Sequence, residues 1–324
     1  MTIGQGAEMK AIMYHYVRPA PEQLPYFRYL HIDDFTRQLD WFARTDRVLN
    51  REEFDVARET GEARNGIVLT FDDGLSDHYH YVLPLLLERG LFGIFYVCTA
   101  PLERRKLLDV HRIHLLLGRL GGQTALRRLS EHLNPDMLSD ADVKAFREAT
   151  YCSQTNDRAT TSFKRILNYL ISYQYRERLL DRLFAQEFDD EGVAQEFYLT
   201  AAQIREMDRL GMVMGSHGVH HYVFSKLPLE RQREEIAGSF ASLATLLGKP
   251  VTTFCYPYGG HHTFTEETVS LLKQAGCLYS FAVNPRAMTS ADLTGNRQAL
   301  PRYDCNMFPY GLASLGTARA QQAA

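Results

Sequence analysis

Short apolar runs alternate with segments of helical periodicity along most of the chain. The runs predict buried strands at residues 11–17, 66–71, 92–98, 212–216, 252–256 and 278–283. The segments between them predict helices at residues 33–43, 78–89, 200–210, 229–247 and 265–275. Strands that alternate with helices form parallel sheets, so this pattern predicts an α/β fold whose sheet is either open or closed into a barrel.

Residues 101–197 break the alternation, because they show helical periodicity and hardly any strand pattern. The polar stretch 186–195 marks the far edge of this segment. We interpret the segment as a helical insertion that follows a barrel strand. A lid, a substrate-binding subdomain and an element that forms a homo-oligomer all remain open as its role. The barrel is then expected in residues 10–100 and 198–310, and residues 317–324 are expected to form a frayed tail.

Two adjacent carboxylates end one of the predicted strands. The stretch 70–74 reads Thr-Phe-Asp-Asp-Gly and follows the apolar residues 67–69. Side chains at a strand end can reach one cavity, and two carboxylates so close together are not expected to share a role. One of them could bind a cation and stay ionised, while the other stays free as a base. A surface Asp-Gly turn explains the pentapeptide equally well when it is considered alone.

A pair of histidines follows another apolar run. His217 and His221 lie four residues apart, directly after residues 212–214. Two imidazoles and one carboxylate make up the three-ligand set of a catalytic zinc site, which leaves one position open for water. The His-x-x-x-His pattern is weak by itself, because 12 histidines in 324 residues produce such pairs by chance. Its place after a strand, like that of the two carboxylates, makes the combination much more specific.

A third apolar run, at residues 253–256, ends in the turn Pro257-Tyr258-Gly259-Gly260. A turn of this kind can direct a backbone N–H into a cavity, which suits the binding of an oxyanion. Without the other two stretches it would be only a turn. All three stretches fall at the carboxyl ends of predicted strands, where barrel active sites are built.

These stretches, in this order, resemble the polysaccharide deacetylase family, which is carbohydrate esterase family 4 with its chitooligosaccharide deacetylase homology domain. Residues 70–74 match the family's Thr-Phe-Asp-Asp-Gly motif in full. His217 and His221 match its His-Ser/Thr-x-x-His motif, although Gly218 replaces the hydroxyl residue. The resemblance implies a distorted (β/α) barrel of fewer than eight strands, here with a helical insertion.

The other two family motifs are incomplete. Pro257 and Tyr258 match the end of the motif Arg-x-Pro-Tyr/Phe, but Cys255 stands where arginine is usual. The late Leu-x-His motif, which supplies a catalytic histidine, has no match, because no histidine follows His262. These departures put the family's usual arginine and usual acid in doubt for this chain.

A subgroup of the family explains both departures. In poly-N-acetylglucosamine deacetylases the last motif is circularly permuted to the N-terminus, as a Tyr-His pair that ends the first strand. Residues 11–17 resemble that pattern and make His15 the candidate for the missing histidine. Arg302 lies in a Leu-Pro-Arg sequence that resembles one in the same subgroup, and it is the candidate for the missing arginine. The resemblance covers residues 10–100 and 198–305.

The resemblance also implies a cofactor and a division of labour between the carboxylates. Asp73, His217 and His221 would bind one divalent metal ion, with zinc preferred and cobalt or nickel as alternatives. Asp72 would be the base that takes a proton from the attacking water. The implied reaction is metal-dependent hydrolysis of the N-acetyl group of an amino sugar.

The remaining roles follow in the same way. The backbone N–H of Tyr258 would stabilise the oxyanion, His15 would protonate the leaving amine, and Arg302 would orient Asp72 and keep it ionised. Two other readings stay open: a deformylase or other deacylase acting on a lipid- or nucleotide-linked amino sugar, and a non-catalytic sugar-binding protein on the same scaffold. The residues expected to line the substrate are Pro257, Tyr222 and Tyr256.

Composition limits the partners further. A net charge of −3 argues against a nucleic-acid-binding protein, which would present a basic face. No stretch reaches the ~18 apolar residues of a membrane span, so stable membrane insertion is not expected. The N-terminus shows no secretory signal, and five scattered cysteines suggest reduced thiols. From these features we expect a cytoplasmic enzyme, and with it a role in glycan biosynthesis.

Overall fold

The computed structural model describes residues 7–103, 106–138, 146, 150 and 156–316. The expected frayed tail, residues 317–324, lies outside them. The chain divides into two compact units. The first unit consists of residues 1–19, 30–103 and 198–313, and the second of residues 20–29, 104–197 and 314–324.

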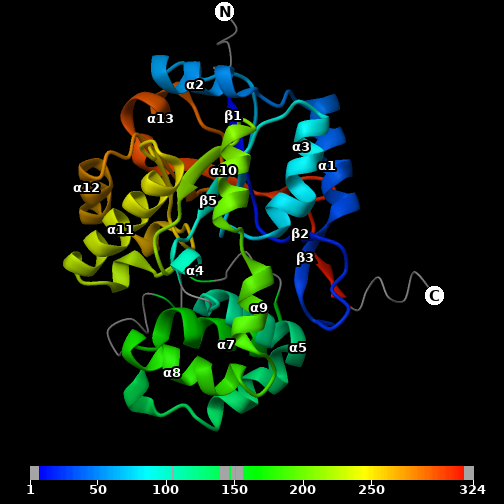
Figure 1. Ribbon diagram of the computed structural model, residues 1–324, viewed down its shortest axis with the longest axis vertical. Helices are drawn as coiled ribbons and strands as arrows, with labels where there is room; N and C mark the ends of the chain where they lie inside the picture. Colours follow the sequence, from blue (N-terminus) through cyan, green and yellow to red (C-terminus); the bar gives the residue numbers. More distant parts are fainter. Residues whose placement is uncertain (1–6, 104–105, 139–145, 147–149, 151–155, 317–324) are drawn as a thin grey trace, which may run out of the picture. The chain divides into compact units, whose positions relative to one another are not determined.

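Seven parallel strands of the described chain close into a barrel in the first unit (Figure 1). The order around the barrel follows the sequence, and the last strand pairs with the first, so that the sheet has no free edge. The predicted fold class, a (β/α) barrel of fewer than eight strands, is confirmed. The barrel strands are β1 (Met9–Tyr14), β4 (Gly66–Phe71), β5 (Ile94–Val97), β6 (Val213–Ser216), β7 (Thr253–Cys255), β8 (Tyr279–Val283) and β9 (Leu300–Asp304).

Strand alternation separates two apolar cores. Successive side chains point to opposite faces of a strand, so β4 places Ile67, Leu69 and Phe71 in the core beneath the helices and Val68 in the barrel interior. Thr70 continues the inward face of Val68 and is fully buried. The carboxylate that comes two residues later is therefore expected at the interior end of the barrel. The fold thus directs one of the two adjacent carboxylates inward and leaves the other at the turn.

Helices of the first unit join the strands and cover the outer core (Figure 1). The predicted helix at residues 229–247 has the same bounds in the structure. The helices are α1 (Ile32–Thr45), α2 (Arg51–Thr60), α3 (Leu83–Glu88), α4 (Ala100–Glu103), α10 (Ala201–Arg209), α11 (Leu229–Leu247), α12 (Glu266–Gln274) and α13 (Ser290–Gly295). None of the helices in the described parts of the chain is both long and apolar enough to cross a bilayer.

Two local details differ from the sequence pattern. Strand β1 ends at Tyr14, and the short strand β2 (Val17–Arg18) pairs with Leu30 and His31 instead of prolonging β1. The helix predicted at residues 78–89 begins as a π-helix at His78–Val82 and becomes α-helical only at Leu83. Short π-helical turns are frequent at functional sites.

The described part of the second unit is mainly helical. Helix α5 (Asp109–Ser130) packs against α7 (Arg158–Arg165) and α8 (Tyr173–Phe184), and α7 continues as a π-helix at Ile166–Leu170. The polar stretch expected as an edge at residues 186–195 leads into a helix, α9 (Asp190–Phe197), because its apolar positions Ala194 and Phe197 are buried. Residues 20–29, which the sequence analysis placed with the barrel, cluster with this unit.

Candidate active site

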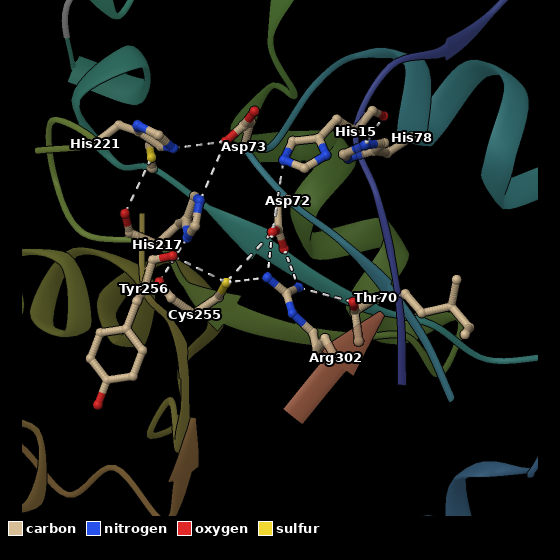
Figure 2. Close-up of polar contacts among 12 residues, drawn as sticks. His15, Thr70, Asp72, Asp73, His78, His217, His221, Cys255, Tyr256 and Arg302 are labelled. Atoms are coloured by element: carbon tan, nitrogen blue, oxygen red, sulfur yellow. Dashed lines mark hydrogen bonds and ion pairs between the residues drawn. The ribbon is translucent and has the colours of Figure 1, made fainter. Parts of the chain in front are cut away.

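The chemically reactive side chains of the first unit gather near the carboxyl ends of five strands (Figure 2). The carboxylates follow β4, the two histidines follow β6, and Cys255 ends β7. Arg302 lies on β9, and His15 follows β1 by one residue. Strands of a closed parallel barrel end at one rim, which is why residues so distant in sequence meet here.

Three of these residues form a possible metal site. Asp73 Oδ1 lies 3.3 Å from His217 Nε2 and 3.3 Å from His221 Nε2. All three residues are buried, and their ligand atoms lie within 4.8 Å of one another. A tetrahedral ion with ligands at about 2.0–2.1 Å has edges of about 3.3–3.4 Å between ligand atoms. The two separations of 3.3 Å therefore fit ligands that share one ion.

The orientation of His217 supports this arrangement. Its Nδ1 donates to the backbone carbonyl of Cys255 over 2.7 Å, so the lone pair of the ring lies on Nε2. That lone pair faces a carboxylate oxygen of Asp73, and two electron-rich atoms approach so closely only with a cation or proton between them. A hydrogen bond from the second ring nitrogen to a carbonyl is the usual support of a metal-binding histidine. The donor set therefore fits a divalent ion.

Asp72 lies beside this cluster and pairs with an arginine. Arg302 Nη1 donates to Asp72 Oδ1 over 2.8 Å and Nη2 donates to Oδ2 over 2.7 Å, which is a bidentate pair. Both residues are almost completely buried. Burial raises the pKa of Asp72, but the charge and hydrogen bonds of Arg302 outweigh it and lower the pKa to about 2. The carboxylate is therefore ionised at neutral pH.

Thr70 and Cys255 complete the surroundings of Arg302. Thr70 Oγ1 accepts from Arg302 Nη1 over 3.0 Å and donates to the carbonyl of Ile12 over 2.9 Å. Cys255 Sγ lies 2.8 Å from Arg302 Nη2 and 3.5 Å from Asp72 Oδ2. Burial raises the pKa of this thiol, which is therefore neutral. Cys255, at the position where the resemblance predicts arginine, is thus a thiol, and the guanidinium that reaches Asp72 comes from another strand.

His15 faces the same group of residues. Its Nε2 lies 4.0 Å from Asp72 Oδ2, and its side chain is 39% exposed. The backbone carbonyl of His15 accepts a hydrogen bond from His78 Nε2 over 3.0 Å. Burial lowers the pKa of His78 to about 4, so this ring is neutral and acts as a donor. The imidazole of His15 is thus accessible to solvent, and the hydrogen bond from His78 fixes its backbone (Figure 2).

The backbone at the site is strained. Only four non-glycine residues of the described chain have a positive φ: Asp73 (80°), His221 (58°), Tyr258 (64°) and Tyr310 (64°). The first three belong to the three motif turns. Such conformations cost on the order of 1–3 kcal/mol each and cluster at functional sites. These backbone conformations bring Asp73, His221 and Tyr258 close together, and their cost suggests that the three turns have a functional role.

The predicted substrate-lining residues do not all meet at the cluster. Tyr258 directly follows Pro257 in the chain. Its ring packs edge-on against His221, with ring centroids 4.8 Å apart. The Tyr222 ring stacks on His220 at 5.3 Å. Tyr256 points away from the cluster in Figure 2, and its hydroxyl donates to the carbonyl of Gln298. The Tyr256 side chain belongs to the outer core because strand alternation directs Cys255 inward.

Sequence reasoning assigned no role to three residues that the structure brings to the cluster. Thr70 was part of a motif but had no function, although its position two residues before Asp72 puts both on one face of β4. His78 carried no signal beyond its place at the start of a predicted helix. Glu235 lies on the buried face of α11, and a charged residue within an apolar stripe was the only available sign.

The family model that matches the chain is described as polysaccharide deacetylase, and it matches residues 155–280. This match includes the histidine motif and the Pro-Tyr turn but not the paired carboxylates. No curated protein sequence matches the chain. The predicted resemblance to the polysaccharide deacetylases is confirmed. The matched residues, 155–280, do not include the Thr-Phe-Asp-Asp-Gly motif at residues 70–74.

Solved structures share the fold over nearly the whole chain. The Streptococcus pyogenes deacetylase PplD, in complex with acetate, is 16% identical with a TM-score of 0.58, and the match covers 95% of this chain and 97% of that one. IcaB from Ammonifex degensii is 18% identical with a TM-score of 0.54, covering 92% and 93%. The BpsB deacetylase domain from Bordetella bronchiseptica is 15% identical with a TM-score of 0.52, covering 93% and 96%. At these identities the likeness is one of fold.

Proposed function

We propose that the chain is a metal-dependent hydrolase that removes the N-acetyl group from an amino sugar, and its match to the polysaccharide deacetylase model supports this proposal. The observation that carries this proposal is the close approach of Asp73, His217 and His221 beside an ionised Asp72. Asp73, His217 and His221 would hold the ion, and zinc is preferred for a set of two imidazoles and one carboxylate. When bound, the ion supplies a Lewis acid that polarises the amide carbonyl and activates water.

Asp72 is the base of the proposed reaction. Its pKa of about 2 keeps it ionised, and its contact with Arg302 fixes both carboxylate oxygens. Asp72 would take one proton from the attacking water, and the proton that the leaving nitrogen needs would come from a second group. His15 Nε2, 4.0 Å from Asp72 Oδ2, is the group that would protonate the amine as the C–N bond breaks. The backbone N–H of Tyr258 would donate to the developing oxyanion.

Acetate release from oligomers of N-acetylglucosamine, with Zn²⁺, Co²⁺ or Ni²⁺ added, tests the proposal. Metal-replete Asp72→Asn protein should lose about 10²-fold or more in turnover, the scale of a lost general base. Asp304→Asn is the matched control, because this aspartate also lies at a strand end but caps the following turn through the N–H of Asn306. Near-normal turnover in Asp72→Asn would remove Asp72 from the mechanism.

The same assay separates the alternatives. Formate released from N-formyl sugars, with no acetate from N-acetyl sugars, would identify a deformylase with the same metal and base. Sugar binding without release of either acid would identify a non-catalytic protein. The intact pair of carboxylates and pair of histidines favours an enzyme over a scaffold that only binds sugar.

A further inference from the structure

One buried carboxylate on a neighbouring helix holds the loop between the two histidines. Glu235, on α11, is 1% exposed. Its Oε2 accepts from the backbone N–H groups of Val219, over 3.0 Å, and His220, over 2.8 Å. Its Oε1 accepts from His220 Nδ1 over 2.7 Å. We propose that Glu235 is a positioning residue that sets the geometry of His217 and His221 for the metal, an inference that rests on the proposed function.

The same face of α11 also holds the start of this loop. Ser239 lies one helical turn after Glu235, and its Oγ lies 2.7 Å from the Oγ of Ser216. Ser216 Oγ in turn accepts from the backbone N–H of Gly218 over 3.2 Å. Two polar residues spaced four apart on one helix therefore reach both the residue before His217 and the two residues before His221.

The opposite side of the loop is held by residues 99 and 100, where the chain passes from β5 into α4. The N–H of Thr99 donates to the carbonyl of Gly218 over 3.2 Å, and the N–H of Ala100 donates to the carbonyl of Val219 over 3.0 Å. The barrel thus fixes the loop carbonyls, whereas Glu235 fixes the loop N–H groups. Both sets of contacts are needed to define the loop, because each buried backbone group requires a partner.

The loop needs this support because its conformation is unfavourable. Glycine adopts the φ of 78° at Gly218 without strain, but His221 has a φ of 58°, and a left-handed histidine persists only where the surroundings enforce it. Glu235 is not itself a candidate ligand, since both of its oxygens are engaged by residues 219 and 220. Loss of its carboxylate would leave two backbone N–H groups without an acceptor and would release His221 from its required direction. The predicted consequence is weaker metal binding.

Metal affinity is the measurement that tests this role. Dissociation constants for Zn²⁺ and Co²⁺ would be measured by chelator competition on the full chain, together with the visible spectrum of the Co²⁺ form. Glu235→Ala should weaken binding by about 10–100-fold, the usual effect of losing an outer-shell partner. It should also change the Co²⁺ spectrum, because the coordination geometry relaxes. Glu235→Gln should restore most of the affinity, since its carbonyl oxygen can still accept from the backbone and its amide can donate to His220.

Gln232→Ala is the matched control on the same helix. Gln232 is buried one turn before Glu235, but it donates to the carbonyl of Leu227 and accepts from Thr268, which do not touch the histidine loop. This variant should lower the melting temperature and leave the metal affinity unchanged. Glu235→Asp provides a second test that keeps the charge but withdraws the carboxylate by one methylene group. It should weaken metal binding even if Glu235→Ala does not fold.

The outcomes separate this inference from the function on which it rests. Wild-type affinity in folded Glu235→Ala or Glu235→Asp protein would overturn the inference and leave the metal site intact. An equal loss of affinity in Gln232→Ala would also overturn it, because the effect would then follow general stability. Wild-type protein that binds neither Zn²⁺ nor Co²⁺ would instead overturn the proposed function, and this inference with it.

Discussion

The buried ion pair of Asp72 and Arg302 leads to a stability prediction that can be worked from its geometry. We predict that Asp72→Asn lowers the free energy of unfolding of the metal-free protein by about 3 kcal/mol at pH 7, the lower end of the cost of breaking a buried pair. The lower end is chosen because the asparagine oxygen can still accept one hydrogen bond from Arg302. The guanidinium, 1% exposed, otherwise keeps its charge without a counter-ion.

The pKa of Asp72 gives a second estimate of the same quantity. The pKa falls from an ordinary value of 3.8 to about 2 in the folded protein. A shift of this size corresponds to about 2 kcal/mol at roughly 1.36 kcal/mol per unit. Because the folded-state pKa is the lower one, this stability is fully present above about pH 4 and is lost as the pH falls toward 2. The difference between wild type and Asp72→Asn should therefore shrink across that interval.

Urea unfolding followed by the fluorescence of Trp41 measures the effect in the barrel unit. Trp41 is the only tryptophan and packs against Phe42 and Phe308. EDTA is present throughout, so that metal binding does not add to the stability of the wild type. The variants are Asp72→Asn, Arg302→Met and the two combined.

The combined variant decides whether the two residues stabilise the protein as a pair. Removing both charges leaves no buried charge unpaired. The double variant should therefore lose about 2–3 kcal/mol less free energy of unfolding than the two single variants lose in sum. Asp46→Asn is a surface control, because the pair of Lys10 and Asp46 is 29% and 22% exposed and should contribute less than about 1 kcal/mol. Strictly additive losses in the double variant, or a pH-independent difference between wild type and Asp72→Asn, would refute the reasoning.

Three further predictions concern the histidines. His217→Ala combined with His221→Ala should lose its metal in elemental analysis, because only one ligand of the set remains; full occupancy would move the site elsewhere. His15→Ala should retain metal and lose about 10²-fold or more on an N-acetyl sugar, but much less on an activated acetate ester, whose leaving group needs no proton; equal losses on both would contradict its role as the acid. His78→Phe should keep the metal and reduce amide turnover by up to about 10²-fold through displacement of His15, and unchanged turnover would limit His78 to packing.

The sequence predicts the elements whose signals are local. Helix α11 has the predicted bounds because its apolar stripe and the closing Gly248 both lie within the segment itself. Helix α2 (Arg51–Thr60) is not predicted, because it is largely charged and buries only Phe54 and Ala57. A helix that buries so little carries a weak periodic signal.

Strand β9 is missed for a different reason. Its inward position is occupied by Arg302, and its sequence Leu-Pro-Arg-Tyr-Asp shows no apolar alternation. An arginine is accommodated inside the barrel because Asp72, 230 residues earlier, pairs with it, and because the rings of Tyr96 and Phe281 lie about it at 6.0 Å and 5.8 Å. Local pattern cannot reveal a strand whose inward residue is stabilised by so distant a partner.

The candidate site likewise combines residues that a local pattern reveals with residues that only distant contacts reveal. The spacing of His217 and His221 points directly to the pair as candidate metal ligands, because both lie in one turn of the chain. The contact of Glu235 with the loop between them depends on how α11 packs on the barrel, which no spacing in the sequence reports. Arg302 and His15 are between these cases, since family resemblance suggested them and their contacts with Asp72 support the suggestion.

Closure of the barrel explains how a residue near the N-terminus such as His15 can lie beside residues that come much later in the sequence. Strand β1 pairs with β4 on one side, with Tyr14 opposite Phe71, and with β9 on the other, with Ala11 opposite Arg302. Parallel strands in a closed barrel all end at one rim, so the order of the strands in the sequence does not restrict which side chains meet there. A histidine that follows the first strand therefore reaches Asp72 as readily as one that follows the last. What the chain must preserve is register, because a shift of one residue in β1 would turn His15 away from the interior.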